Sequence, residues 1–269
     1  MPERAGRPSP LPTIRAVSAF HVIAAYLFVD IDDGPALRDR LQAAAQGAGL
    51  KGTVLIAPEG INISLAGPPA AVLGWLALLR ADRRFAAVEV KTHSAATLPF
   101  GRLRFKLKRE IIRMNELGLR PQAGRAPAVD AATLQRWLDT GRCDAGRPVV
   151  MLDTRNAFEV DAGSFAGALD WRLAKFSDFP AALQAHQAEL QDKTVVSFCT
   201  GGIRCEKAAL WMAQVGVQHV WQLDGGVLRY FEQTRGAPHW RGDCVVFDAR
   251  GAVDPALRAA ATPPPGAGS

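Results

Sequence analysis

Short apolar runs of strand length alternate with helical stretches along the first 114 residues. In the helical stretches, 32–46 and 68–80, apolar side chains such as Leu37 and Leu41 recur every three to four positions. The strand-like runs lie at 23–29, 53–57, 61–66 and 88–91. An order of strand, helix, two strands, helix and strand is typical of a ferredoxin-like fold. We therefore expect an α+β domain over residues 19–114.

A second series of strands and helices occupies residues 130–236. Strands are expected at 148–152, 194–198 and 219–223, and helices at 130–140, 180–190, 206–215 and 227–233. Residues 156–168 suggest only a loop with short turns. Strands that alternate with helices predict a parallel sheet with helices on both faces. The expected fold class is α/β, with a ferredoxin-like domain followed by a parallel-sheet domain.

Three segments outside these domains differ in composition. Residues 1–18 contain prolines and arginines without periodicity, which predicts a flexible arm. Residues 115–129 carry glycines and prolines and are expected to link the two domains. Residues 237–269 form a C-terminal tail, in which 242–248 is one more short strand before an Ala/Pro/Gly-rich end.

Composition excludes several classes of protein. The 269 residues are 48% hydrophobic and 22% charged, which is typical of a globular chain. No segment reaches the roughly 18 apolar residues of a membrane span, and the N-terminus lacks the apolar part of a secretory signal. The four cysteines are irregularly spaced, so they predict neither a disulfide framework nor a metal site. We expect a cytoplasmic protein, with no cofactor evident because flavin, haem and iron motifs are missing.

The net charge of +6 permits an acidic partner such as a nucleic acid, and the place where basic residues cluster indicates where it would bind. A strand over residues 102–109 would place Leu103, Phe105 and Leu107 on one face and cationic side chains on the other. Such a face can be a solvated edge that discourages strand pairing. Adjacent charges of one sign repel each other, however, and a phosphate backbone would explain them. The candidate RNA-binding residues are Arg102, Arg104, Lys106, Lys108 and Arg109.

The strongest chemical signal is Cys199, at the junction of the strand 194–198 and a helix. Backbone N–H groups and the helix dipole at such a junction favour the thiolate, which is the reactive form of cysteine. A buried structural cysteine is the alternative, but it would not require two glycines and an arginine directly after it. The candidate catalytic residue is Cys199, within a loop formed by Thr200, Gly201, Gly202, Ile203 and Arg204. Cys205 has either a packing role or a resolving role in redox chemistry.

Four residues separate Cys199 from Arg204. Cysteine-dependent phosphatases have five, so this tighter loop suits a smaller group such as a persulfide sulfur or an oxidised cysteine. Its length resembles the active loop of rhodanese domains. Asp153 and Arg155 follow the strand 148–152, at the edge where α/β sheets place their sites. They form either a structural ion pair or part of the catalytic site.

Several segments together resemble the rhodanese-containing tRNA uridine hydroxylases, over about residues 20–250. The matching stretches are 51–62, 104–111, 152–156, 198–208, 222–227 and 242–248. The resemblance implies a rhodanese-like second domain and an oxygen-dependent activity that needs the loop cysteine, here Cys199. It also implies that the N-terminal domain helps to hold tRNA. Many members carry further cysteines in the tail, where this chain has only Cys244.

The leading hypothesis is oxygen-dependent hydroxylation of the wobble uridine in the tRNA anticodon loop, giving 5-hydroxyuridine, with molecular oxygen as co-substrate. The alternative is a sulfurtransferase that carries a persulfide on Cys199, which the loop chemistry fits equally well. A non-enzymatic RNA-binding module is the third hypothesis, and the intact cysteine loop argues against it.

Overall fold

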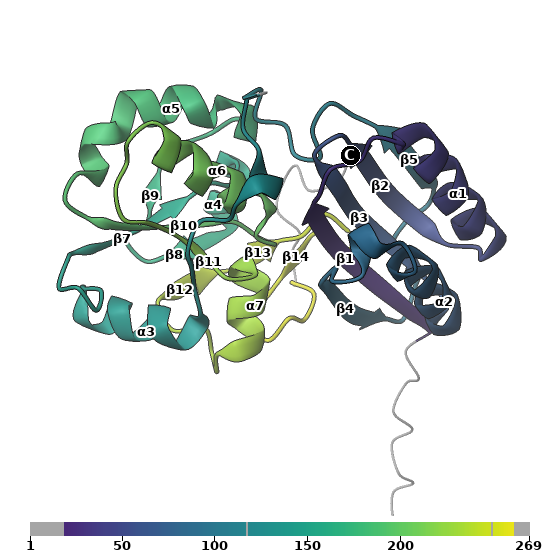
Figure 1. Cartoon of the computed structure of the whole chain (residues 1–269). Helices are drawn as coiled ribbons and strands as arrows, with labels where there is room; N and C mark the ends of the chain where they lie inside the picture. Colours follow the sequence, from purple (N-terminus) through teal and green to yellow (C-terminus); the bar gives the residue numbers. More distant parts are fainter. Residues whose placement is uncertain (1–18, 117, 249, 261–269) are drawn as a thin grey trace, which may run out of the picture.

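The computed structural model describes residues 19–116, 118–248 and 250–260 (Figure 1). Two sheet-containing domains lie side by side. The predicted arm at 1–18 and the end of the tail lie outside the described residues. Within the described ranges, no helix has the length and apolar character needed to cross a membrane.

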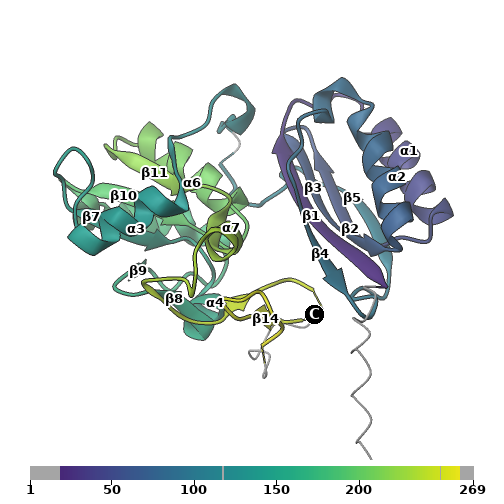
Figure 2. The same ribbon diagram turned by 90° about the horizontal axis from the view of Figure 1, so that it is seen from below.

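The N-terminal domain has the predicted ferredoxin-like topology. Its strand order is β4-β1-β3-β2-β5, in which only β2 and β5 are parallel neighbours. The two helices α1 and α2 cover one face, and the other face is turned toward the second domain (Figure 2). The elements are β1 (Phe20–Phe28), α1 (Gly34–Gly47), β2 (Lys51–Ala57), β3 (Gly60–Gly67), α2 (Pro69–Arg80), β4 (Val90–Ala95) and β5 (Leu103–Leu107).

Alternation along the strands separates the core from the open face of this sheet. Ile23 of β1 and Val54 of β2 are fully buried beneath the helices. Leu103 and Phe105 of β5 pack against the same core, while Arg104 and Lys106 are exposed. This is the division of faces expected for a strand with a period of two. Leu107 pairs with Ile56 and lies on the core face as well, but it is the last residue of an edge strand and its side chain is exposed.

The C-terminal domain has the predicted parallel sheet, with strand order β6-β11-β10-β7-β9. Apolar side chains of α3 and α7 form a core on one face, and those of α5 and α6 form a core on the other. The elements are β6 (Ala128–Val129), α3 (Ala131–Thr140), β7 (Val149–Asp153), α4 (Ala157–Ala162), β8 (Gly163–Phe165), β9 (Leu169–Asp170), α5 (Phe179–His186), β10 (Thr194–Phe198), α6 (Ile203–Gln214), β11 (Val220–Leu223) and α7 (Gly226–Gln233).

The structure differs from the sequence prediction in several places. The helix after Cys199 begins at Ile203, three residues before the expected start, because Gly202 takes φ 106° and its carbonyl accepts the first hydrogen bond of the helix from the Glu206 N–H. Residues 156–168 contain α4, at whose start the Asn156 N–H donates to the Glu159 carboxylate at 3.1 Å. The segment expected only to link the domains contributes β6, which pairs with β11. The single tail strand predicted at 242–248 is instead divided into short pieces.

The tail packs onto the C-terminal domain. Strand β12 (Trp240–Gly242) pairs with β8, and β13 (Cys244–Val245) pairs with β14 (Ala252–Val253). Cys244 and Val253 are fully buried in the core beneath β10. The described part of the tail is therefore an integral part of this domain, and it brings β13 and β14 close to the N-terminal sheet (Figure 1).

Candidate active site

The loop from Cys199 to Gly202 joins β10 to α6 and is held in place by the start of α7. Val227 N–H donates to the Cys199 carbonyl at 3.0 Å, and Leu228 N–H donates to the Thr200 carbonyl at 3.1 Å. Gly226 has φ 68°, and a Cβ there would lie 2.4 Å from the Cys199 carbonyl oxygen. Only glycine permits this approach, so α7 fixes the backbone that carries the cysteine.

The Cys199 thiol is fully buried and accepts hydrogen bonds from its own loop. Gly202 N–H donates to Sγ at 3.1 Å, and the Cys205 thiol lies 3.9 Å from it. Burial raises the pKa of Cys199, but the Cys205 thiol, the Arg204 guanidinium and the loop N–H groups outweigh it and lower this pKa to about 5. The pKa of Cys205 is correspondingly raised well above its ordinary value by the bond to Cys199 and by burial. Cys199 is therefore the thiolate of the pair at neutral pH.

Arg204 forms a buried, bidentate ion pair that the sequence did not predict. Its two terminal nitrogens donate to the Glu159 carboxylate at 2.5 and 2.7 Å, and both side chains are almost fully buried. The Thr200 hydroxyl lies 3.3 Å from the same carboxylate and 3.3 Å from the Val245 carbonyl. Burial raises the pKa of Glu159, but Arg204 outweighs it and the pKa is lowered. The loop is thus anchored to α4 and to the tail at once.

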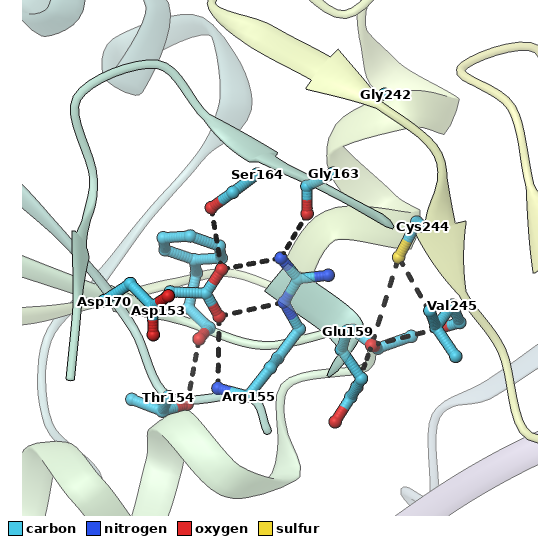
Figure 3. A network of polar contacts seen from close by, with 12 residues as sticks. Asp153, Thr154, Arg155, Glu159, Gly163, Ser164, Asp170, Gly242, Cys244 and Val245 are labelled. Carbon is cyan, nitrogen blue, oxygen red and sulfur yellow. Dashed lines mark hydrogen bonds and ion pairs between the residues drawn. The ribbon is translucent and has the colours of Figure 1, made fainter. Parts of the chain in front are cut away.

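Asp153 and Arg155 form a separate ion pair beside Gly163 and Ser164 (Figure 3). Arg155 Nε and Nη2 donate to the Asp153 carboxylate at 2.8 and 2.6 Å, and both side chains are fully buried. Arg155 Nη2 also donates to the Gly163 carbonyl, and the Ser164 hydroxyl donates to Asp153. Of the two interpretations, the geometry favours an ion pair that ties the end of β7 to β8.

The open face of the N-terminal sheet contacts the cysteine loop directly. The Tyr26 hydroxyl of β1 donates to Glu206 of α6 at 3.0 Å, and Lys91 Nζ of β4 donates to the Gly201 carbonyl at 3.2 Å. Lys91 Nζ also donates to the Gly225 carbonyl. These contacts seat the loop over β1 and β4.

The predicted basic strand lies on this same face, at the opposite edge of the sheet. The strand register places one residue of each strand in a single row across the sheet, from β5 to β4: Arg104, Thr53, Ser64, Ala24 and Lys91. Paired residues point to the same side of a sheet, and four strand spacings amount to about 20 Å. A second row likewise relates Lys106 to Tyr26. All five predicted cationic side chains are exposed: Arg102, Arg104, Lys106, Lys108 and Arg109.

A cavity of about 1050 Å³ lies between the domains, bounded by the loop, the open sheet face and the tail. Five predicted loop residues border it: Cys199, Thr200, Gly201, Ile203 and Arg204. Gly202, Cys205, Asp153, Arg155 and the basic strand do not. Sequence analysis missed Tyr26, Lys91, Arg125 and Arg229, which border the cavity from other elements. Nothing local in the sequence marks them, because their roles depend on how the domains meet. The described residues hold no group of three or more His, Cys, Asp or Glu side chains suited to a metal ion.

Comparison with known proteins accounts for both domains. Residues 20–111 match the family described as UPF0176 acylphosphatase like domain, and residues 130–233 match the rhodanese-like domain. A tRNA uridine(34) hydroxylase of Bordetella avium is 61% identical over 88% of this chain and 97% of its own length. One of Variovorax paradoxus is 60% identical over 89% of this chain and 90% of its own. By this similarity, the chain belongs to the tRNA uridine(34) hydroxylase family.

Proposed function

We propose that this protein hydroxylates C5 of uridine 34 in tRNA and that Cys199 is its reactive group. The observation that carries the proposal is a buried thiol with a lowered pKa, bordering a cavity that the N-terminal sheet shares. The relatives at about 60% identity are named as tRNA uridine(34) hydroxylases, which favours hydroxylation over sulfur transfer. We place the reaction in the cytoplasm.

The chemistry requires an electrophilic oxygen, because C5 is the nucleophilic carbon of uracil. Addition of molecular oxygen to the Cys199 thiol would give a cysteine peroxide. Attack of C5 on its terminal oxygen breaks the O–O bond, C5 loses its proton, and a sulfenic acid remains on Cys199. Two thiols then reduce this acid, forming a disulfide and releasing water. One oxygen atom enters the nucleoside, the other leaves as water, and the thiols supply two electrons.

The substrate has to present a single base to this cavity. A wobble base lies in the single-stranded anticodon loop, where it is unpaired and can be turned out of the stack at low cost. The basic strand lies on the sheet face that continues to the cysteine loop, so phosphates bound there would align the RNA with the cavity. We therefore propose that Arg102, Arg104, Lys106, Lys108 and Arg109 bind the tRNA backbone.

Mass spectrometry of tRNA nucleosides tests the function. A strain lacking its own hydroxylation genes is complemented with the wild-type protein, with Cys199→Ser or with the matched control Cys143→Ser. We expect 5-hydroxyuridine with the wild type and the control only. Equal recovery with Cys199→Ser would show that the thiol is dispensable.

Two assays with purified protein identify the source of the inserted oxygen atom and test the alternative function. With labelled molecular oxygen, a thiol reductant and tRNA, the heavy isotope should appear in the nucleoside, and incorporation from water instead would refute the peroxide step. Transfer of sulfur from thiosulfate to cyanide should be negligible. Rapid transfer without nucleoside oxidation would favour the sulfurtransferase.

A further inference from the structure

Phe247 is an exposed aromatic side chain beside the cysteine loop. It is 59% exposed, whereas Val246 before it is 4% exposed and the side chain of Asp248 after it is 9% exposed. Among the described residues, the other large hydrophobic side chains with comparable exposure are Leu73, Leu107 and Val215, and these do not border the cavity. A single exposed apolar side chain is common in proteins. Its position at the cavity is what requires an explanation.

The backbone that carries Phe247 is held on both sides of the ring. Val246 N–H donates to the Gly251 carbonyl at 3.0 Å, which closes the turn between β13 and β14. Asp248 accepts two hydrogen bonds from the Arg250 guanidinium, at 2.9 and 2.7 Å, and lies 3.7 Å from His93 of β4. The ring therefore projects from a segment that is hydrogen-bonded on both sides of it, and Asp248 lies near the N-terminal sheet.

The same turn is tied to the catalytic loop. The Thr200 hydroxyl, next to Cys199, lies within hydrogen-bond distance of the Val245 carbonyl. The Arg204 guanidinium lies 5.9 Å from the centroid of the Phe247 ring, while its N–H groups remain bonded to Glu159. The ring therefore lies beside Arg204, on the cavity that Cys199 also borders, and more than half of its surface is open to a second planar group.

We propose that Phe247 is the surface on which the target uracil stacks while C5 faces Cys199. This inference rests on the proposed function and adds to it the residue that positions the base. Aromatic side chains bind unpaired bases through their π faces without hydrogen-bond readout. Loss of one such contact weakens binding about tenfold. The role requires a flat ring, so another aromatic residue should substitute for phenylalanine and an aliphatic residue should not.

Fluorine NMR can detect the stacking without turnover. The probe is an anticodon stem-loop with 5-fluorouridine at position 34, bound to Cys199→Ser protein without oxygen. A ring above the base should move the fluorine resonance upfield in Cys199→Ser and in Cys199→Ser/Phe247→Trp. The shift should disappear in Cys199→Ser/Phe247→Leu. An unchanged shift with leucine, or no shift in the protein that keeps Phe247, would overturn the inference.

The steady-state kinetics of tRNA hydroxylation give a second test of the inference. Phe247→Leu should raise KM about tenfold, Phe247→Trp should stay near wild type, and Leu73→Ala controls for loss of an exposed apolar side chain. Because the ring is exposed, thermal melting should be unchanged in each variant. If the wild-type protein forms 5-hydroxyuridine but Phe247→Leu leaves KM unaltered, the stacking inference is wrong and the proposed function stands. If the wild type forms none, the proposed function fails, and the NMR arm still decides whether the base stacks.

Discussion

The ammonium group of Lys207, on α6 of the cysteine loop, lies 2.8 Å from the carboxylate of Glu59 in the turn between β2 and β3. Glu110, which follows the basic strand, accepts a second hydrogen bond from the same group at 2.7 Å, and the Ile112 carbonyl accepts a third at 3.1 Å. Lys207 is 1% exposed, so this cation is fully enclosed between the domains. One side chain thus fixes the helix that follows the cysteine loop to two segments of the N-terminal domain.

Lys207→Met should therefore destabilise the protein by about 3–5 kcal/mol, because two carboxylates would remain enclosed without their cation. Unfolding in urea measures this loss. Lys175→Met is the matched control, since Lys175 is exposed and its pair with Asp178 is long, at 3.8 Å. The combined variant Lys207→Met/Glu59→Gln/Glu110→Gln should recover most of the stability, because it removes the unpaired charges. A loss for Lys207→Met no larger than that of Lys175→Met would contradict the assignment.

The Cys199 thiol should ionise at about pH 5. The ultraviolet absorbance of the thiolate, taken as the difference between wild type and Cys199→Ser, should rise through that pH and be complete at neutrality. Cys205→Ala should move the midpoint upward, because the hydrogen bond between the two cysteine side chains lowers the pKa of Cys199. Cys143→Ala should leave it in place. A wild-type midpoint near the ordinary cysteine value of about 8.5 would disprove thiolate stabilisation by the loop.

The basic strand should contribute to tRNA affinity through phosphate contacts. Arg104→Ala/Lys106→Ala should weaken binding to all tRNAs similarly and reduce the slope of log affinity against log salt by about 2. The control is Arg38→Ala/Arg40→Ala, which removes the same charge from the helical side of the same domain. Filter binding over a range of salt concentrations gives both slopes. Equal slopes for the two variants would show that only net charge matters.

Local patterns were sufficient to predict most of the framework. The period-two alternation of β5, the apolar strand β10 and the glycines after Cys199 each depend on neighbours in sequence, and each element is present in the structure. The helix α4 was missed although Asn156 and Glu159 have the spacing of a capping box. Attention to that spacing would have predicted the helix, but not that Glu159 pairs with Arg204.

Contacts between the domains could not be predicted in this way. Lys207 and Glu59 are 148 positions apart, and an isolated lysine in a helix most often points into water. Tyr26 and Lys91 likewise acquire their roles only when the open face of the sheet meets the cysteine loop. The tail was predicted only as one short strand outside the two domains, yet Val245 and Phe247 lie beside the loop.

Glu159→Gln should cost about 3–5 kcal/mol of stability at neutral pH, because Arg204 would stay buried without a counter-charge. Asp161→Asn is the control on the same helix. Its pair with Arg172 is exposed, so its loss should be below about 1 kcal/mol. Thermal or urea unfolding compares the two variants with wild type.

The pH dependence of this difference tests its electrostatic origin. Because Arg204 lowers the pKa of Glu159 in the folded protein, the ion pair contributes fully above the unfolded pKa, near 4.5, and its contribution is lost as pH falls through the folded value. The gap between wild type and Glu159→Gln should therefore be constant near neutrality and shrink under acid conditions. A gap that is independent of pH would indicate that glutamine disturbs packing rather than charge, and Arg204 would then need another anion to explain its burial.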